Sequence, residues 1–199
     1  MAKSYKATTG VDQFYYGVLN EEENGTSGAP ERVKFTQNIT VEAPQEIARA
    51  YGDNKVAEIA TSNQPVTVSG QFHKLPLEDR VAILGLEQTE DGLTGYGGTD
   101  NPPYVGAVFA KTHEDKSIEW VGLPKGKFMK PSQEVNTKED TVEFGNDTIE
   151  AEFIDREVTG FNEDKSVIFG RDEAGETAAR DAIFMAVFGE PHPDGEPAA

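Results

Sequence analysis

Apolar and acidic residues alternate through the segment 137–157, TKEDTVEFGNDTIEAEFIDRE, which Gly145-Asn146-Asp147 interrupts. Side chains of an extended chain point to opposite faces with a period of two, so this pattern is typical of a half-buried strand. The apolar set is Val142, Phe144, Ile149, Ala151 and Phe153, and the acidic set is Glu143, Glu150 and Glu152. One face is predicted to pack in a core, while the other presents carboxylates to water.

Similar short runs recur along the chain and predict a mainly β protein. They are Phe14–Asn20, Glu31–Val41, Gln64–Lys74, Tyr104–Thr112, Ser117–Leu123 and Ser166–Gly170. Glu46–Tyr51 and Lys55–Thr61 flank Gly52-Asp53-Asn54, residues that tolerate the backbone of a tight turn, which predicts a further hairpin. Val108 and Trp120 are expected to face inward. About nine strands predict a β-sandwich of two packed antiparallel sheets.

Two segments change to a helical period. Leu77, Val81 and Leu84 recur at helical spacing and Gly85 follows, so we expect a flanking helix over 77–85 that covers one opening of the sandwich. Residues 178–188 predict a second short helix near the C-terminus, with Thr177 as its N-cap.

The remaining segments read as arms and loops of one domain. Residues 1–190 are predicted to form a single domain with an N-terminal arm and long loops at 21–30 and 87–103. Loops longer than about 12 residues are usually functional or disordered, so we expect the second loop to contact another molecule or to move. The proline-rich end, 191–199, is predicted to be a flexible tail.

Charge and composition narrow the function. The 199 residues carry a formal net charge of −18, which argues against a nucleic-acid reader, because such a protein needs a basic patch. The absence of cysteine excludes disulfides, thiolate metal sites and cysteine nucleophiles. We expect neither a secretory leader nor contact with a membrane, because MAKSYKATTG has no apolar run and no stretch approaches the roughly 20 apolar residues of a span.

Catalytic patterns are missing from the sequence. His73, His113 and His192 have no partners at metal-ligand spacing and are expected to be ordinary solvated histidines. No G-x-S-x-G motif occurs, and residues 122–127 lack the spacing of a phosphate-binding loop. No catalytic, cofactor-binding or metal-binding residue is therefore expected, and a structural or binding role is favoured.

The order of motifs between Gly70 and Phe161 resembles that of the major tail protein family of long-tailed, non-contractile bacteriophages, chiefly those of Gram-positive hosts. The resemblance covers about half of the chain and rests on order and spacing more than on any single motif. The residues that carry it are Tyr51-Gly52-Asp53-Asn54, Val68-Ser69-Gly70, the helix from Leu77 to Leu86, Asp91-Gly92, Val105–Phe109, Trp120, Lys125–Phe128, Thr137–Thr141, Asp147–Glu150, and Arg156-Glu157 leading to Gly160.

This resemblance implies a structural, non-enzymatic subunit of the siphovirus virion, made in the bacterial cytoplasm. Family members assemble as hexameric rings, homohexamers that stack into a hollow tube. The implied partners are other copies of the chain, the tape-measure protein, and tail terminator and baseplate proteins. Double-stranded DNA would pass through the lumen during genome ejection without specific binding, and no cofactor is implied.

Physical arguments suggest which residues would serve such a tube. An acidic bore would repel DNA, which carries one charge per about 1.7 Å, so Glu143, Glu150 and Glu152 are candidate lumen-facing acids. The alternative, that these acids face the outside of the tube, stays open. The candidate ring-contact loop is represented by Gly92, Tyr96, Asp100 and Tyr104.

Two other functions compete with this interpretation. A phage or surface carbohydrate-binding β-sandwich would use Tyr96, Tyr104 and Trp120 as stacking platforms, although core packing or subunit contact is the favoured explanation of these aromatics. An acid-pair glycosidase is the remoter possibility, because nothing near the glutamates would raise one pKa above another.

Overall fold

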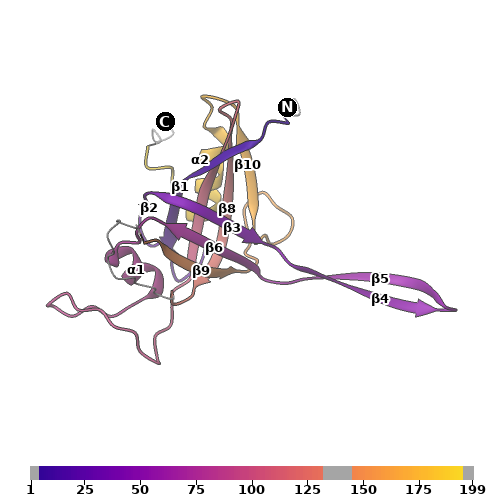
Figure 1. Ribbon diagram of the computed structural model, residues 1–199, viewed down its shortest axis with the longest axis horizontal. Helices are drawn as coiled ribbons and strands as arrows, with labels where there is room; N and C mark the ends of the chain where they lie inside the picture. The colour runs from indigo at the N-terminus through magenta and orange to yellow at the C-terminus, as the bar shows by residue number, and fades with distance from the viewer. Residues whose placement is uncertain (1–4, 132–144, 195–199) are drawn as a thin grey trace, which may run out of the picture.

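A computed structural model describes residues 5–131 and 145–194, and within these the protein is mainly β with two antiparallel sheets and two helices (Figure 1). The strands are β1 (Thr8–Val18), β2 (Glu31–Val33), β3 (Thr36–Glu42), β4 (Gln45–Gly52), β5 (Lys55–Asn63), β6 (Val66–Phe72), β7 (Val105–His113), β8 (Ile118–Phe128), β9 (Asp147–Phe153) and β10 (Ile168–Asp172), and the helices are α1 (Leu77–Leu84) and α2 (Ala178–Phe188).

The predicted β-sandwich is confirmed, and one continuous eight-stranded sheet supplies both of its layers. The strand order is β2-β1-β7-β8-β9-β6-β3, with β10 paired to β8 as well. The first half of β8 pairs with β10, whereas its end, Gly126–Phe128, pairs with β9. The layer of β3, β6 and β9 therefore turns at β8 and crosses the layer of β1, β7, β8 and β10 (Figure 1).

Gly126 is required at this turn of the sheet. A Cβ atom at this position would lie 2.5 Å from the Phe153 ring and 2.6 Å from the Glu152 carbonyl oxygen. Because real Cβ contacts are much longer, only glycine lets β8 and β9 approach this closely.

The main core lies between the two layers. β9 contributes Ile149, Ala151 and Phe153, all buried, while Glu150 and Glu152 are exposed. The predicted alternation is thus confirmed for this strand. Val142, Phe144 and Glu143 lie outside the described residues.

A second core lies on the outer face of the β1-β7-β8-β10 layer, beneath α2. Val108 and Trp120 are buried, but they pack against Phe184 and Val187 of α2 and not inside the sandwich. Both residues therefore face inward, as expected, but into the core under α2 and not between the two layers. The sequence did not separate these two cores, because β7 is buried on both faces and its continuous apolar run shows no alternation.

Helix α1 begins and ends close to the prediction. Gly85 forms a left-handed C-cap, with its N–H bonded to the Val81 carbonyl oxygen, and Ile83 and Leu84 are buried in the main core. Arg80 joins the helix to β9 through a 2.9 Å ion pair with Asp147.

The N-terminus of α2 is stabilised by a residue outside the helix. The Asp172 carboxylate, which is buried, accepts hydrogen bonds from the backbone N–H groups of Ala179 (2.8 Å) and Arg180 (2.9 Å). Thr177 occupies the N-cap position, but its side chain makes no capping hydrogen bond, so the predicted role of Thr177 is corrected. Asp172 lies five residues upstream, where a local sequence pattern does not reveal a cap.

The start of the expected C-terminal tail is packed against the body of the protein. His192 is 2% exposed, and its ring meets Phe184 edge-on at a centroid separation of 4.6 Å, with Tyr15 and Trp120 nearby. Burial lowers the pKa of His192, and its Nδ1 accepts a hydrogen bond from the N–H of Asp194. His192 is therefore not an ordinary solvated histidine, and the chain is held in place at least to this residue.

We predict that Asp172→Asn lowers the free energy of unfolding by about 1–2 kcal/mol, because the substitution weakens two charge-assisted hydrogen bonds at the helix N-terminus. Urea unfolding followed by circular dichroism measures the change. Thr177→Ala is the matched control and should change stability far less. Equal losses from the two variants would contradict the assignment of the cap to Asp172.

Candidate functional site

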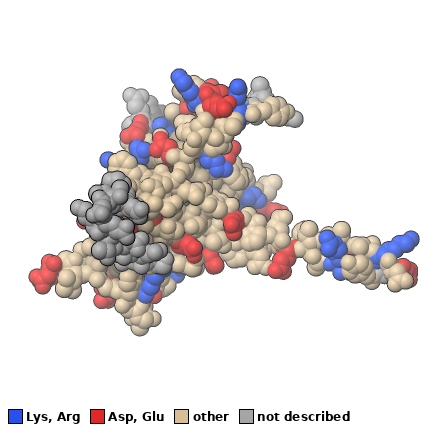
Figure 2. Space-filling model, in the orientation of Figure 1, with Lys and Arg blue, Asp and Glu red and all other residues tan. Residues whose placement is uncertain are grey.

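The outer face of the β3-β6-β9 layer is a continuous polar surface, and we call it the polar face. Cross-strand pairing aligns its residues in three rows, because directly paired residues point to the same side. The rows are Asn38, Gln71 and Thr148, then Thr40, Ser69 and Glu150, then Glu42, Thr67 and Glu152. Three of these nine residues are acidic, none is basic, and Figure 2 shows carboxylates on the face that these strands present to the viewer.

Two of the three sequence-predicted acids lie on this polar face. Glu150 and Glu152 are exposed side by side on β9, and Glu42 joins them from β3. The sequence pattern does not reveal Glu42 as a member of this group, because the strands that bring it beside Glu152, β3, β6 and β9, are far apart in the chain. The third candidate, Glu143, lies outside the described residues.

A basic cluster borders the polar face at the end of β8. It consists of Lys125, Lys127 and Lys130, and Lys127 pairs in register with Glu152. The ammonium groups of Lys125 and Lys127 lie over the Tyr104 ring, 4.3 and 4.6 Å from its centroid. Lys125 also forms an ion pair with Glu23. Tyr104 is thus held in a cation–π arrangement by the cluster.

The same cluster fastens the loop 87–103. Lys130 donates hydrogen bonds to the Gly97 carbonyl oxygen (2.8 Å) and to Asp100 (3.1 Å), and its ammonium lies 5.4 Å from the centroid of the Tyr96 ring. Asp100 also accepts a hydrogen bond from the Gly97 N–H. This backbone hydrogen bond, assisted by Lys130, lowers the pKa of Asp100.

The four predicted ring-contact residues therefore have different surroundings. Tyr96 and Asp100 lie against Lys130. Tyr104 directly precedes β7, and the ammonium groups of Lys125 and Lys127 lie over its ring. Gly92 is in a separate exposed turn, with a φ of +80° that glycine adopts readily, and its N–H bonds to the Thr89 carbonyl oxygen. Lys130 therefore holds the part of the loop around Gly97 and Asp100, whereas Leu93, in the other part, is exposed.

A projecting hairpin is the surface that sequence reasoning did not single out. Among the strands that the structure describes, β4 and β5 pair only with each other, and Figure 1 shows them extending away from the body of the protein. Four large apolar side chains on this hairpin are exposed: Ile47, Tyr51, Val56 and Ile59.

All four apolar side chains point to one face of the hairpin. Ile47 and Tyr51 are separated by four positions on β4 and so share a face. Tyr51 pairs with Val56, and Ile59 pairs with Arg49, which also lies on that face. The opposite face carries Ala48 paired with Ala60, and Ala50 paired with Glu58. The hairpin thus has one apolar face and one face of small and acidic residues.

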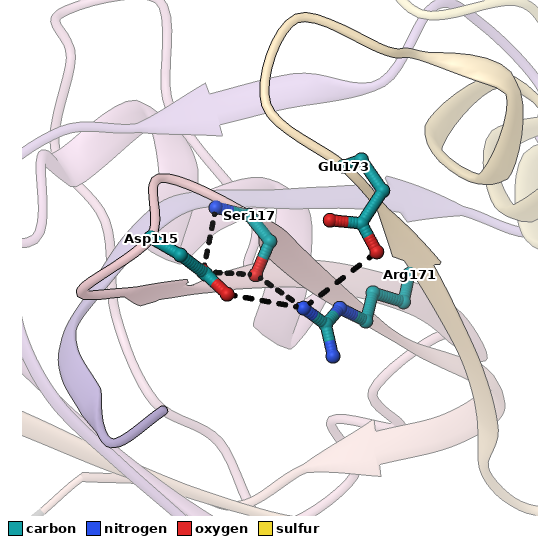
Figure 3. A network of polar contacts seen from close by, with 4 residues as sticks. All are labelled: Asp115, Ser117, Arg171 and Glu173. Atoms are coloured by element: carbon teal, nitrogen blue, oxygen red, sulfur yellow. Dashed lines mark hydrogen bonds and ion pairs between the residues drawn. The ribbon is translucent and has the colours of Figure 1, made fainter. Parts of the chain in front are cut away.

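A polar network joins the β7–β8 turn to β10 (Figure 3). Ser117, fully buried, donates its hydroxyl to Asp115 (2.6 Å), and Arg171 donates to the Ser117 hydroxyl (3.0 Å) and to Asp115 (3.3 Å). Arg171 also lies 3.8 Å from Glu173. Because the Ser117 hydroxyl is fully buried and already donates to Asp115, the network acts as a structural brace between the β7–β8 turn and β10.

In 5–131 and 145–194, no group of three or more histidine, cysteine or acidic side chains could hold a metal ion. The helices found there are too short or too polar to cross a membrane. Trp120 is 2% exposed, so it is not available as a sugar-stacking platform, and its alternative role in core packing is confirmed.

Acidification should release the loop 87–103 from Lys130. The pKa of Asp100 is lower in the folded chain than its ordinary value of 3.8. The stabilisation that the Asp100 carboxylate gives to the folded loop is therefore complete above that value, and it is lost as the pH falls through the folded pKa. Asp100→Asn should mimic this at neutral pH and accelerate hydrogen exchange of the Gly97 amide. Asp91→Asn, in the same loop, is the control. An unchanged exchange rate of the Gly97 amide in Asp100→Asn would contradict the role of Asp100 in holding the loop.

Comparison with protein-family models identifies the chain. The model of the phage tail tube protein family matches residues 7–192, nearly the whole sequence. A search of curated proteins returned no match. The match extends the resemblance seen in the sequence to both ends of the described structure, including β1 and α2. The chain belongs to the phage tail tube protein family.

Proposed function

We propose that this protein is the major tail tube subunit of a long-tailed phage, and that its copies form hexameric rings stacked into a hollow tube through which DNA enters the host. The family match supports self-assembly into a tube within the virion. The observation that carries the finer proposal is the polar face of β3, β6 and β9, which has nine polar residues in register and no basic residue among them.

The polar face has the chemistry of a channel wall for DNA. Its carboxylates at Glu42, Glu150 and Glu152 repel phosphates, and its hydroxyl and amide groups carry no positive charge that would hold the duplex. A wall rich in lysine would instead bind phosphates and slow the passage of DNA. The lysines that border this face already contact other groups of the same chain: Lys125 contacts Glu23 and Tyr104, and Lys130 contacts Asp100.

The edges of the sheet supply the means of closing a ring. β3 pairs with β6 alone among the described strands, so its other edge is open to a strand from another copy. Exposed edges of this kind normally promote aggregation, but a closed ring of identical subunits satisfies them. A ring joined at this edge would place the polar faces of successive subunits in one continuous wall.

The hairpin β4–β5 and the loop 87–103 are the proposed contacts between copies. An isolated two-stranded hairpin is at best marginally stable in water, so a hairpin with four exposed apolar side chains requires a partner surface. Its strands are roughly 30 Å long at 3.3 Å per residue, enough to reach a neighbouring subunit. The loop, with Gly92 and Leu93 exposed, offers a second contact.

The proposed role requires no catalysis and no cofactor. The tape-measure protein would occupy the lumen during assembly, and terminator and baseplate proteins would close the two ends of the tube. Glu143 remains a proposed lumen residue on the basis of the sequence alternation, although it lies outside the described residues.

Charge reversal tests the proposed wall. The triple variant Glu42→Lys, Glu150→Lys, Glu152→Lys should form tubes of normal appearance and slow genome ejection, because lysines in the lumen bind DNA phosphates. Ejection is measured in vitro by the release of dye-accessible DNA from particles carrying the variant.

The matched control reverses three exposed acids elsewhere, Glu114, Glu176 and Glu190, and so makes the same change in net charge. The control should leave ejection unchanged. Equal ejection rates in the triple variant and the wild type, with intact tails, would contradict the assignment of this face to the lumen.

A second pair of variants tests the contacts between copies. Ile47→Asp with Ile59→Asp should abolish tube formation seen by electron microscopy, because two charges replace the apolar surface that a neighbour must cover. Leu93→Asp with Tyr96→Asp changes two exposed side chains of the loop instead.

Circular dichroism and thermal melts check that both variants fold, which is expected because all four side chains are exposed. We expect the hairpin variant to cause the larger loss of assembly. Tubes that form normally from the hairpin variant would contradict the proposed role of β4–β5.

A further inference from the structure

A groove of 980 Å³ lies at the root of the hairpin, and we infer that it receives the β4–β5 hairpin of a second copy of this chain. The inference rests on the proposed tube function and adds the acceptor surface to it. The groove opens on the side opposite the polar face, because Ile39, Val41 and Val66, which line it, point to the other side of the same strands. Of the nine residues in the polar-face rows, Thr40 is the one that also lines the groove.

The groove has a mixed lining, in which apolar side chains stand beside polar and charged ones. Its floor is formed by Phe109, Val121 and Phe153, which belong to the main core of the sandwich. Its walls include Phe169, 64% exposed, and Ile154, 38% exposed. Apolar side chains this exposed beside the core leave a surface that a partner can cover favourably, at roughly 25 cal/mol per Å² of apolar area.

The groove lies between strands that have open edges. β3 contributes Ile39 to Val41, and β10, which pairs with β8 alone among the described strands, contributes Phe169. A β-ribbon is the kind of element that fits between two such strands, because it can offer both side chains and backbone groups to them.

The apolar face of the hairpin is the surface on this chain that matches the groove. It presents Ile47, Tyr51, Val56 and Ile59 together, and each is at least 47% exposed. The opposite face carries Ala48, Ala50 and Ala60, whose small side chains permit close approach on that side as well.

The charges of the hairpin and the groove are complementary. Arg49 lies within the apolar face of the hairpin, and the groove has Asp155, Glu163 and Asp164 on its rim. Such pairing fixes the orientation of a docked hairpin more than it adds affinity.

A hairpin cannot fill the groove at its own root. Gln45 and Asn63, the residues at the base of the hairpin, form part of the groove wall, and from there the strands run outward, away from the body (Figures 1 and 2). The occupant must therefore come from another copy. Each copy would give one hairpin and receive one, a head-to-tail contact that continues from subunit to subunit.

Engineered cysteines test the docking directly, because the natural chain has none. One chain carries Val56→Cys on the apolar face of the hairpin, and a second carries Ser166→Cys in the groove wall. The two are mixed at high concentration and oxidised, and the disulfide-linked peptides are identified by mass spectrometry. Val56→Cys paired with Ser27→Cys, in an exposed loop, is the matched control.

We expect the disulfide between positions 56 and 166 to exceed that between 56 and 27 by on the order of tenfold, because docking raises the effective concentration of the two thiols. Absence of this excess, or a preferred link to position 27, overturns the groove as the acceptor. Electron microscopy of the same mixtures reports separately on tube formation. Tubes without the 56–166 link would refute the groove alone, whereas the link without tubes would support the groove and refute the tube function.

Discussion

The division of β8 between two partners is the constraint on which the rest of the structure depends. Its first half pairs with β10, and its last residues pair with β9, which carries β6 and β3 across the other layer. Gly126 permits the close crossing, because any side chain there would collide with Phe153 and the backbone of β9. The main core, the polar face and the root of the hairpin all follow from this turn of a single sheet. The second core, under α2, then covers the remaining apolar side of the same strands.

The cores of the folded subunit are well packed, but the β3 edge and the apolar face of the hairpin have no partner among the described residues. Buried aromatic and aliphatic side chains fill both cores, while β3 retains an open edge and the hairpin exposes four large apolar side chains. In a monomer such features are liabilities, because they favour uncontrolled association. In the proposed tube the same features form the contacts between subunits. The hydrophobic effect would then drive both the folding of each subunit and the association of neighbouring copies. The loop 87–103 differs from the hairpin, because Lys130 and the backbone already hold it on the subunit.

Acidic and basic residues are unevenly distributed over the surface of the folded protein. The acidic residues of the polar face have no lysine or arginine among their partners on β3, β6 and β9, and Lys127, in register with Glu152, marks the border with the basic cluster. The lysines of that cluster, Lys125, Lys127 and Lys130, contact Glu23, Asn101 and Asp100 and so hold neighbouring loops in place. Net charge alone would have explained solubility, but it would not have explained this arrangement.

Local patterns in the sequence determined the strands, the two helices and the alternation in β9, because the period of side-chain directions is a property of a few adjacent residues. They also predicted the β4–β5 hairpin from its turn, and Glu150 and Glu152 as exposed acids. Tertiary structure decided everything that depends on distant partners. Trp120 faces α2 because β7 and β8 are covered on both sides, Asp172 and not Thr177 caps α2, and His192 is buried among aromatic rings. Glu42 lies on the polar face, and the hairpin projects beside the groove at its root, because strand pairing and packing join segments far apart in the chain.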